Sequence, residues 1–385
     1  MEPWEFVMLI IDMMKYLVVI ICAIGFLLSA CEYRTVSRKQ VNSFGSKNFA
    51  GDSLFEVVGV IDHPIITLDN PGAEGNIFGF EGGRVIKLDN EYHLFTTEMY
   101  DEPVWCRTRI SHWKSKDGIA WTRDATLFES SGNFTGSDSH AAMWSPMPAF
   151  DEKQNCWILT YVCYRSKPNT SEKWYRNYDG IIALAESVVK GIKGIDGPYI
   201  EVTTLMNSDT SEPKLGLMGV DSFFPFEVNG QWLAFYGSSP EWNGLAKASS
   251  LRGPWKRSEE AGMVSQHTEN PVVQILKEDL YIAFFDGCGV YQKFGYMISS
   301  DGIHWSDPLL IDFENNPDKW WGLSRTPLGL IDEGEGKYTL YFTAYNKNIY
   351  QIPGIWEAKS DSVFNGFFAS VGMVKLKLRK EYSKP

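Results

Sequence analysis

The chain repeats one pattern of hydrophobic and polar positions five times. Each copy opens on a first residue, here called the head, continues through a short apolar run and a polar turn, and ends in an aromatic residue that opens a second apolar run. Short apolar runs separated by turn residues are typical of β-strands. Repetition every 48 to 76 residues predicts a radial array of small sheets. The heads are Glu81, Ser145, Asp221, Glu269 and Arg325.

The second half of each copy predicts an outer hairpin. Ser-x-Asp-Gly-Ile-x-Trp occurs at 115–121 and 299–305, and Gly-Pro-aromatic at 197–199 and 253–255. Asp-Gly between two strand-like runs is a strong hairpin signal, because glycine accepts positive φ. We therefore expect an all-β fold, a five-bladed β-propeller of four-stranded antiparallel blades. One more strand within 54–67 is expected to pair with 368–378 and close the ring.

Three of the five heads are carboxylates, Glu81, Asp221 and Glu269. A radial array brings equivalent positions together at its axis, so these acids are expected to share one catalytic pocket. Glycoside cleavage needs a protonated carboxyl and an ionised carboxylate at one pH, which clustered acids provide. A capping or turn role is the alternative for each. Glu98 and Asp286, which follow the second runs of their copies, are reserve acids.

Other side chains near the heads are candidates for substrate binding. An arginine at the axis would hold sugar hydroxyls or a substrate carboxylate, or else fix Glu81 or Asp221 in a salt bridge. A histidine there would contact substrate or serve as a hydrogen-bonded structural group, and tryptophan rings would stack on sugars or pack in the core. The predicted substrate-binding residues are Arg84, His140, Trp144, Trp321 and Arg325.

The first 52 residues are expected to lie outside the folded domain. Residues 1–31 read as a bacterial lipoprotein signal peptide that ends in Leu-Ser-Ala-Cys, with Cys31 as the lipidated residue and Met14 as a possible true start. An ordinary cleaved signal or an uncleaved anchor is the alternative. Residues 32–52 would be a tether and 53–380 the catalytic domain. The expected location is the bacterial cell envelope, in the periplasm or on the cell surface, with the membrane reached by the lipid anchor only.

Composition narrows the class of partner. The net charge is −12 with a pI of about 5.1, which argues against nucleic acid. Aromatic residues make up 14 % of the chain, with 14 Trp, which suits a protein that binds oligo- or polysaccharide as well as it suits a β-rich core. The cysteine spacing fits no zinc pattern, and no metal site is predicted. We expect a monomer that requires no cofactor; no spacing supports a structural calcium.

The turns and the head acids resemble those of the five-bladed β-propeller glycoside hydrolases, the superfamily that includes glycoside hydrolase family 43. The resemblance covers about residues 54–380, and the Trp-x-Asn-Asp-Pro-Asn motif of the fructan-cleaving members is absent. It implies a base at the first head, a modulator at the third and an acid at the fourth, which are here Glu81, Asp221 and Glu269. Glu81 departs from the family, which has Asp at that place.

The resulting hypothesis is an inverting, exo-acting glycosidase that removes arabinofuranose-like or related sugars from side chains of plant-type polysaccharides. A glycoside phosphorylase on the same scaffold is a second hypothesis, and it would need a basic phosphate site in place of the base. The third is a surface lipoprotein that binds glycans without cleaving them, which would keep the aromatic residues without needing acids at three heads.

Overall fold

The structure is a computed structural model that describes residues 53–168, 175–208, 218–238, 242–259, 263–266, 268–277, 280–286, 294–311, 313, 316, 318–346 and 368–379. The expected signal peptide with Cys31, and the tether, lie outside these residues. Within them the fold is all-β apart from one short 3-10 helix, η1 (Ile192–Asp196). No helix in this part of the chain has the length and apolar character needed to cross a membrane.

Consecutive strands form three separate antiparallel sheets. The first contains β6 (Ala142–Asp151), β7 (Cys156–Pro168), β8 (Tyr175–Lys190) and β9 (Tyr199–Met206). The second contains β10 (Asp221–Val228), β11 (Gln231–Ser238), β12 (Trp242–Ala248) and β13 (Lys256–Arg257), with β14 (Met263–Gln266) also paired to β12. The third contains β15 (Glu269–Lys277), β16 (Leu280–Asp286), β17 (Phe294–Ser299) and β18 (Leu309–Leu310).

The remaining eight strands form one sheet with two antiparallel halves. One half contains β2 (Gly79–Leu88), β3 (Glu91–Met99), β4 (Thr108–Ser115) and β5 (Trp121–Glu129); the other contains β19 (Leu323–Gly334), β20 (Lys337–Tyr345), β21 (Ala369–Leu378) and β1 (Phe55–Val60). Among the described residues, a parallel pair of Gly79 with Ala369 joins the halves. A side chain at Gly79 would put its Cβ 2.2 Å from the Ala369 carbonyl oxygen, so only glycine allows this approach.

The first described strand completes the last half-sheet, as the sequence predicts. β1 pairs antiparallel with β21 from Phe55 opposite Leu378 to Val60 opposite Val374. The first and last described strands therefore lie side by side, and this half-sheet is completed by residues more than 300 positions earlier in the sequence.

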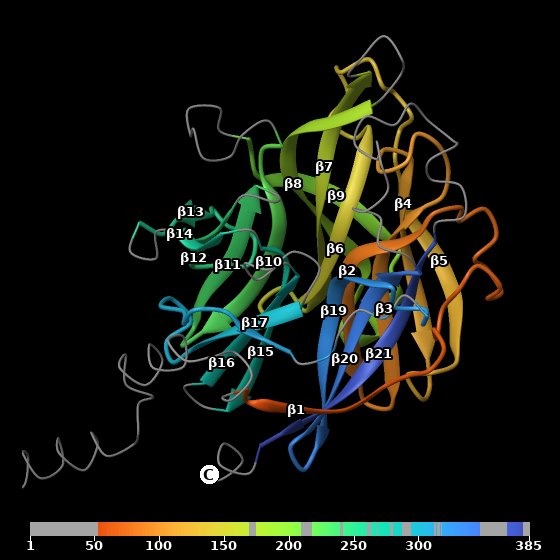
Figure 1. Cartoon of the computed structure of the whole chain (residues 1–385). Helices are drawn as coiled ribbons and strands as arrows, with labels where there is room; N and C mark the ends of the chain where they lie inside the picture. Colours follow the sequence, from red (N-terminus) through yellow and green to blue (C-terminus); the bar gives the residue numbers. More distant parts are fainter. Residues whose placement is uncertain are drawn as a thin grey trace, which may run out of the picture.

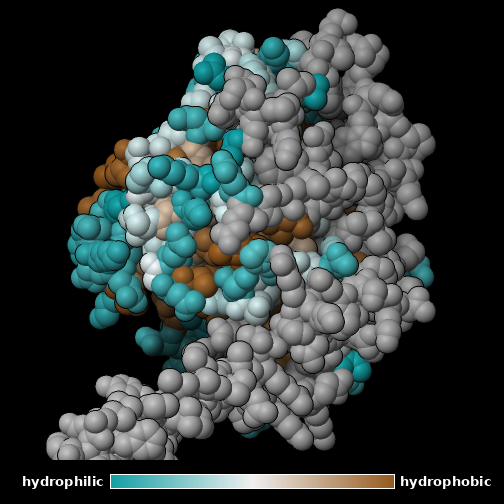
Figure 2. Space-filling view, turned by 90° about the vertical axis from the view of Figure 1, so that its left-hand side faces the viewer, coloured by the Kyte–Doolittle hydropathy of each residue, from teal (hydrophilic) through white to brown (hydrophobic). Residues whose placement is uncertain are grey.

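Five strands lie at the middle of the molecule and touch one another in a closed cycle (Figure 1): β2 contacts β6, β6 contacts β10, β10 contacts β15, β15 contacts β19, and β19 contacts β2. Hydrophobic side chains fill the spaces between neighbouring sheets. Phe95 of β3 and Tyr161 of β7 belong to one buried cluster, and the rings of Phe235 and Phe285 meet edge to face at 5.3 Å. The described surface on the side of β10–β14 is mainly hydrophilic, with hydrophobic residues between the polar ones (Figure 2).

The two Ser-x-Asp-Gly-Ile-x-Trp segments form the same turn. In each, a serine hydroxyl accepts from the glycine N–H, at 2.9 Å for Ser115 and 2.8 Å for Ser299. The aspartate Oδ1 accepts two following backbone N–H groups, and the tryptophan Nε1 donates to the glycine carbonyl. The first turn joins β4 to β5, and the second leads out of β17. The prediction of four-stranded antiparallel units is thus confirmed. The two Ser-x-Asp-Gly-Ile-x-Trp segments form the turns that the sequence predicts.

Candidate active site

Each of the five central strands has a register irregularity where its head residue lies. The shifts fall between Glu81 and Gly83, Trp144 and Met147, Asp221 and Phe224, Glu269 and Val272, and Ser324 and Pro327. A bulge bends its strand and re-aims a side chain, and bulges are frequent next to active sites. The register also corrects the sequence alignment by one residue in two strands, because Trp144, not Ser145, and Ser324, not Arg325, occupy the place of the three acids.

The residue after the head adopts a left-handed backbone in four of these strands. Gly82, Ser145, Ser222 and Asn270 have φ of 72°, 51°, 53° and 50°. Glycine and asparagine accept this region readily. At Gly82 a Cβ would also lie 2.5 Å from the Ser145 hydroxyl oxygen, so glycine lets β2 approach β6 closely beside Glu81.

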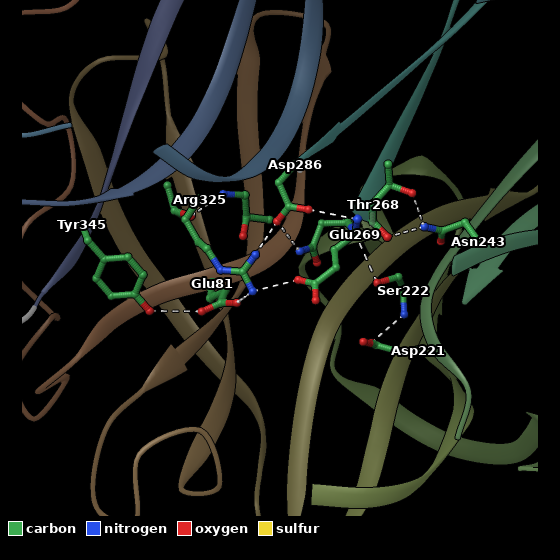
Figure 3. Close-up of polar contacts among 12 residues, drawn as sticks. Glu81, Asp221, Ser222, Asn243, Thr268, Glu269, Asp286, Arg325 and Tyr345 are labelled. Carbon is green, nitrogen blue, oxygen red and sulfur yellow. Dashed lines mark hydrogen bonds and ion pairs between the residues drawn. The ribbon is translucent and has the colours of Figure 1, made fainter. Parts of the chain in front are cut away.

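One arginine gathers three of the carboxylates at the centre of the ring (Figure 3). Nη2 of Arg325 lies 2.6 Å from Glu81 Oε1 and 2.8 Å from Glu269 Oε2. Nη1 of the same side chain lies 2.5 Å from Asp286 Oδ2. Glu81 of β2, Glu269 of β15 and Asp286 of β16 therefore meet at Arg325, which lies on β19.

Asp221 joins this cluster through a chain of hydrogen bonds between β15 and β10. Asp286 accepts from the Glu269 N–H at 3.0 Å and from the Asn270 side-chain amide at 3.1 Å. The Asn270 N–H donates to the Ser222 hydroxyl at 3.3 Å, and the Ser222 N–H donates to Asp221 Oδ1 at 2.6 Å. These bonds fix the positions of the two heads relative to each other before any substrate is present.

Burial and mutual repulsion raise the pKa values of three of the clustered acids, Glu81, Asp221 and Asp286. Burial and the charge of Glu269 raise the pKa of Asp221 to about 7. Burial, opposed by Arg325, raises the pKa of Asp286 to about 8. Burial also raises the pKa of Glu81, while Arg325 and the Tyr345 hydroxyl act in the opposite direction. Asp221 and Asp286 therefore keep a proton up to near neutral pH, and an acid that holds a proton at this pH is what general acid catalysis requires.

The structure brings Glu81, Asp221, Glu269 and Arg325 together, and it places the other predicted residues elsewhere or beside them. Arg84 lies on β2, where Nη1 donates to the Pro148 carbonyl at 3.1 Å and the guanidinium stacks over Phe224. Burial lowers the pKa of Arg84 to about 10. Its role in substrate binding stays a prediction.

His140 pairs with Glu201 on the outermost strand β9, with Nε2 2.9 Å from Oε2, and not with the acid cluster. This contact is the structural role that the sequence left open for His140. Trp144 and Trp321 are each 8 % exposed and belong to hydrophobic clusters, so they match the core-packing alternative. Trp144 nevertheless lies at a head position, which keeps it next to the site.

Sequence reasoning missed several members of the cluster. Ser222 and Asn270 link the heads, and the Tyr345 hydroxyl donates to Glu81 Oε2 at 3.2 Å. Asp286, only a reserve acid, lies directly opposite Glu269 in the β15–β16 pair. Pairing the residues of the predicted β15–β16 hairpin outward from its turn would have placed Asp286 opposite Glu269. Nothing near Tyr345 in the sequence marks it, because it reaches Glu81 only through the contact between the two halves of the large sheet.

Comparison with known proteins gives a structural likeness only. No protein-family model and no curated protein matches the sequence. Among solved structures, an RGII complex of BT0996 has a TM-score of 0.57 and 13% identity, covering 86% of this chain and 92% of that chain. The exo-β-1,3-galactanase 1,3Gal43A from Clostridium thermocellum has 0.53 and 15%, covering 85% of this chain and 64% of that chain.

A third structure, the GH43_1 enzyme from Xanthomonas citri complexed with xylose, has a TM-score of 0.52 and 10% identity, covering 84% of this chain and 92% of that chain. At identities this low, the structural overlap shows a shared fold and nothing more. The protein thus has the fold of glycoside hydrolase family 43 structures.

Proposed function

We propose that this protein is a glycoside hydrolase that cleaves by carboxylate acid–base catalysis. The observation that carries the proposal is the convergence of Glu81, Glu269 and Asp286 on Arg325, with Asp221 linked to them, at the centre of a ring of strands. Acids with raised pKa values beside an arginine-paired carboxylate are what proton donation to a leaving sugar oxygen needs. The shared fold with structures named as glycosidases supports it.

We also propose that the domain, residues 53–380, is a five-bladed propeller. The closed cycle of contacts among β2, β6, β10, β15 and β19 supports five blades, each beginning with one of these strands. The large sheet would then be two blades joined by the pair of Gly79 with Ala369, the second of them completed by β1. The axis of such a ring is where the acid cluster lies.

Within the cluster Glu269 serves as the acid, Glu81 as the base and Asp221 as the modulator. Glu81 is held by two donors, Arg325 and Tyr345, and both favour its ionised form. Asp221, with a pKa of about 7, is partly protonated near neutral pH, and the charge of neighbouring Glu269 is one cause of this raised pKa. Arg325 holds both catalytic carboxylates and contacts substrate hydroxyls when a sugar enters.

The reaction is proposed to invert the anomeric centre, and the cluster must open for that. Glu81 Oε1 and Glu269 Oε2 both bond Arg325 Nη2, so their separation is at most 5.4 Å, the sum of 2.6 and 2.8 Å. Inverting pairs are roughly 6.5–9.5 Å apart, whereas retaining pairs are about 5–5.5 Å apart. NMR of the first product anomer tests this: an inverted product requires the pair to separate around the sugar, and a retained one would assign Glu81 as nucleophile.

The proposed substrate is a side chain of a plant-type polysaccharide, from which terminal arabinofuranose-like or related sugars are released. The test is sugar release from arabinan, xylan, β-1,3-galactan and RGII fragments by wild type and by Glu269→Gln, with and without phosphate. Release by wild type alone supports the hydrolase. Release that depends on phosphate would establish a phosphorylase instead, and binding without release would establish a glycan-binding protein.

The protein is further proposed to be anchored to the bacterial cell envelope through a lipid on Cys31, as a monomer. Metabolic labelling with a radioactive fatty acid tests the anchor. Label on wild type that is lost in Cys31→Ser would support it, and unlabelled protein in the soluble fraction would contradict it.

A further inference from the structure

A second cluster of ligating side chains lies outside the acid site. His93 of β3 and His112 of β4 stack with their rings 5.3 Å apart and nearly parallel. Asp196, the last residue of η1, reaches the same point from the neighbouring sheet. One nitrogen of each histidine and one carboxylate oxygen all lie within 4.8 Å of one another. Neither the glycosidase proposal nor the cysteine pattern uses these residues.

The distances in this cluster suit a transition-metal ion. Nδ1 of His93 lies 3.1 Å from Nε2 of His112. Zinc holds histidine nitrogens at about 2.0–2.1 Å, so two nitrogens of a tetrahedral site lie about 3.3 Å apart. Asp196 Oδ1 is 4.0 Å from His93 Nδ1, and its side chain is 46% exposed, so it has room to move toward an ion.

Each histidine turns its other ring nitrogen toward a carboxylate. Nδ1 of His112 lies 3.1 Å from Asp124 Oδ2, and Nε2 of His93 lies 3.6 Å from Glu91 Oε2. A carboxylate behind a metal-bound imidazole fixes its tautomer and increases its basicity.

We propose that His93, His112 and Asp196 form a Zn²⁺ site that ties β3 and β4 to η1. His112 would bind through Nε2 and His93 through Nδ1. The proton that His93 Nδ1 shares with His112 moves to His93 Nε2, beside Glu91, when the ion binds, so no proton leaves the pair. The exposed Asp196 side gives the ion a way in, since both histidines are buried.

Charge around the cluster is compatible with a cation. Lys114 Nζ lies 3.1 Å from Asp124 and 2.9 Å from Asp196, and Lys116 pairs with Glu91. Three carboxylates face two ammonium groups, so the surroundings carry an excess of one negative charge. Lys114 holds the oxygen of Asp196 that does not face the histidines.

The test uses the whole protein freed of metal with EDTA. Calorimetric titration with Zn²⁺ is expected to show one ion per chain, and thermal unfolding to shift up by about 5 °C at a hundredfold excess over Kd. Co²⁺ is expected to give the intense visible bands of a four-coordinate ion. Asp196→Asn and His93→Gln should each weaken Zn²⁺ binding at least about tenfold.

The matched control is His304→Gln, which removes a single histidine paired with Asp301 at 2.7 Å on another turn. It should leave the Zn²⁺ response unchanged. A Zn²⁺ shift that survives in both Asp196→Asn and His93→Gln, or no shift in wild type, would overturn the site. The two histidines would then be a hydrogen-bonded pair only. Sugar release is not the readout, so the metal site and the glycosidase proposal fail or stand separately.

Discussion

The ratio of buried carboxylates to arginines is opposite at two places in this molecule, around Glu98 and around Arg325. Glu98 is 0 % exposed and receives Arg109 Nε, Arg123 Nε at 3.0 Å and Trp113 Nε1 at 3.0 Å. One carboxylate there faces two guanidinium groups. The central cluster is the reverse, with four carboxylates around Arg325. Removing one partner of a buried ion pair strongly destabilises a fold, whereas a cleft with several acids of raised pKa is typical of a functional site.

A difference of one residue in strand register explains why Asp286 joins the central cluster and Glu98 does not. Asp286 lies opposite the head Glu269, while the residue opposite the head Glu81 is Thr97. Glu98 is one position further along its strand than the equivalent of Asp286. Successive side chains of a strand point to opposite faces, so Glu98 points away from the cluster and into the arginines of β4 and β5. Glu98 and Asp286, the two reserve acids, have similar sequence contexts, and this difference in register separates them.

The largest expected effect is on turnover at the centre of the ring. Glu269→Gln keeps the shape of the side chain and removes its proton, so kcat on the released-sugar assay should fall about a thousandfold. The affinity of Glu269→Gln for an oligosaccharide, measured by calorimetry, should be little changed. Glu227→Gln, on the exposed end of β10, is the matched control and should retain full activity. Equal turnover of Glu269→Gln and wild type would remove the central cluster from catalysis.

Glu98→Gln should act on stability instead. It leaves two partly buried arginines without their carboxylate, so the free energy of unfolding should fall by about 3 kcal/mol. Denaturant titration measures the loss, and kcat per folded molecule should stay within a factor of about two. A collapse of kcat in protein that remains folded would show that Glu98 takes part in catalysis, and the contrast between the two groups would fail.

Asp221→Asn should raise stability in a pH-dependent way while lowering activity. The folded pKa of Asp221, about 7, lies above its ordinary value of 3.8, so the unfolded chain releases this proton first. Wild-type stability therefore falls as the pH rises from about 4 to about 7, and the amide avoids this fall. Unfolding should show a gain of about 1–2 kcal/mol at pH 8 and a smaller one at pH 5. An equal change at both pH values would contradict the raised pKa.

Tyr345→Phe should have the smallest effect. It removes the hydroxyl that donates to Glu81 and helps to lower its pKa. The acid limb of the kcat/KM profile should move up by about half a pH unit, with activity down several-fold. Tyr338→Phe, on the same strand and away from the cluster, serves as the control. An unshifted profile in Tyr345→Phe would mean that this hydroxyl does not influence Glu81.

The hydrophobic pattern by itself determined much of the fold. Short apolar runs, Asp-Gly turns and the repeat interval were enough to predict four-stranded antiparallel units, the outer turns and the closing pair of β1 with β21, because these depend on local pairing and on turn chemistry. The repeat also located Glu81, Asp221 and Glu269 at equivalent strand positions, with Arg325 one residue after the equivalent Ser324, and the structure brings these four charged residues together.

Only the tertiary structure decided which further groups join them. Asp286 and Glu98 share a sequence context, and strand register sends one to the axis and the other to Arg109 and Arg123. His93 and His112 meet through the pairing of β3 with β4, and Asp196, more than 80 residues later, joins them only because the end of η1 lies beside that pair. Contacts between sheets depend on bulges and on packing across the ring, and neither is written in a local run of residues.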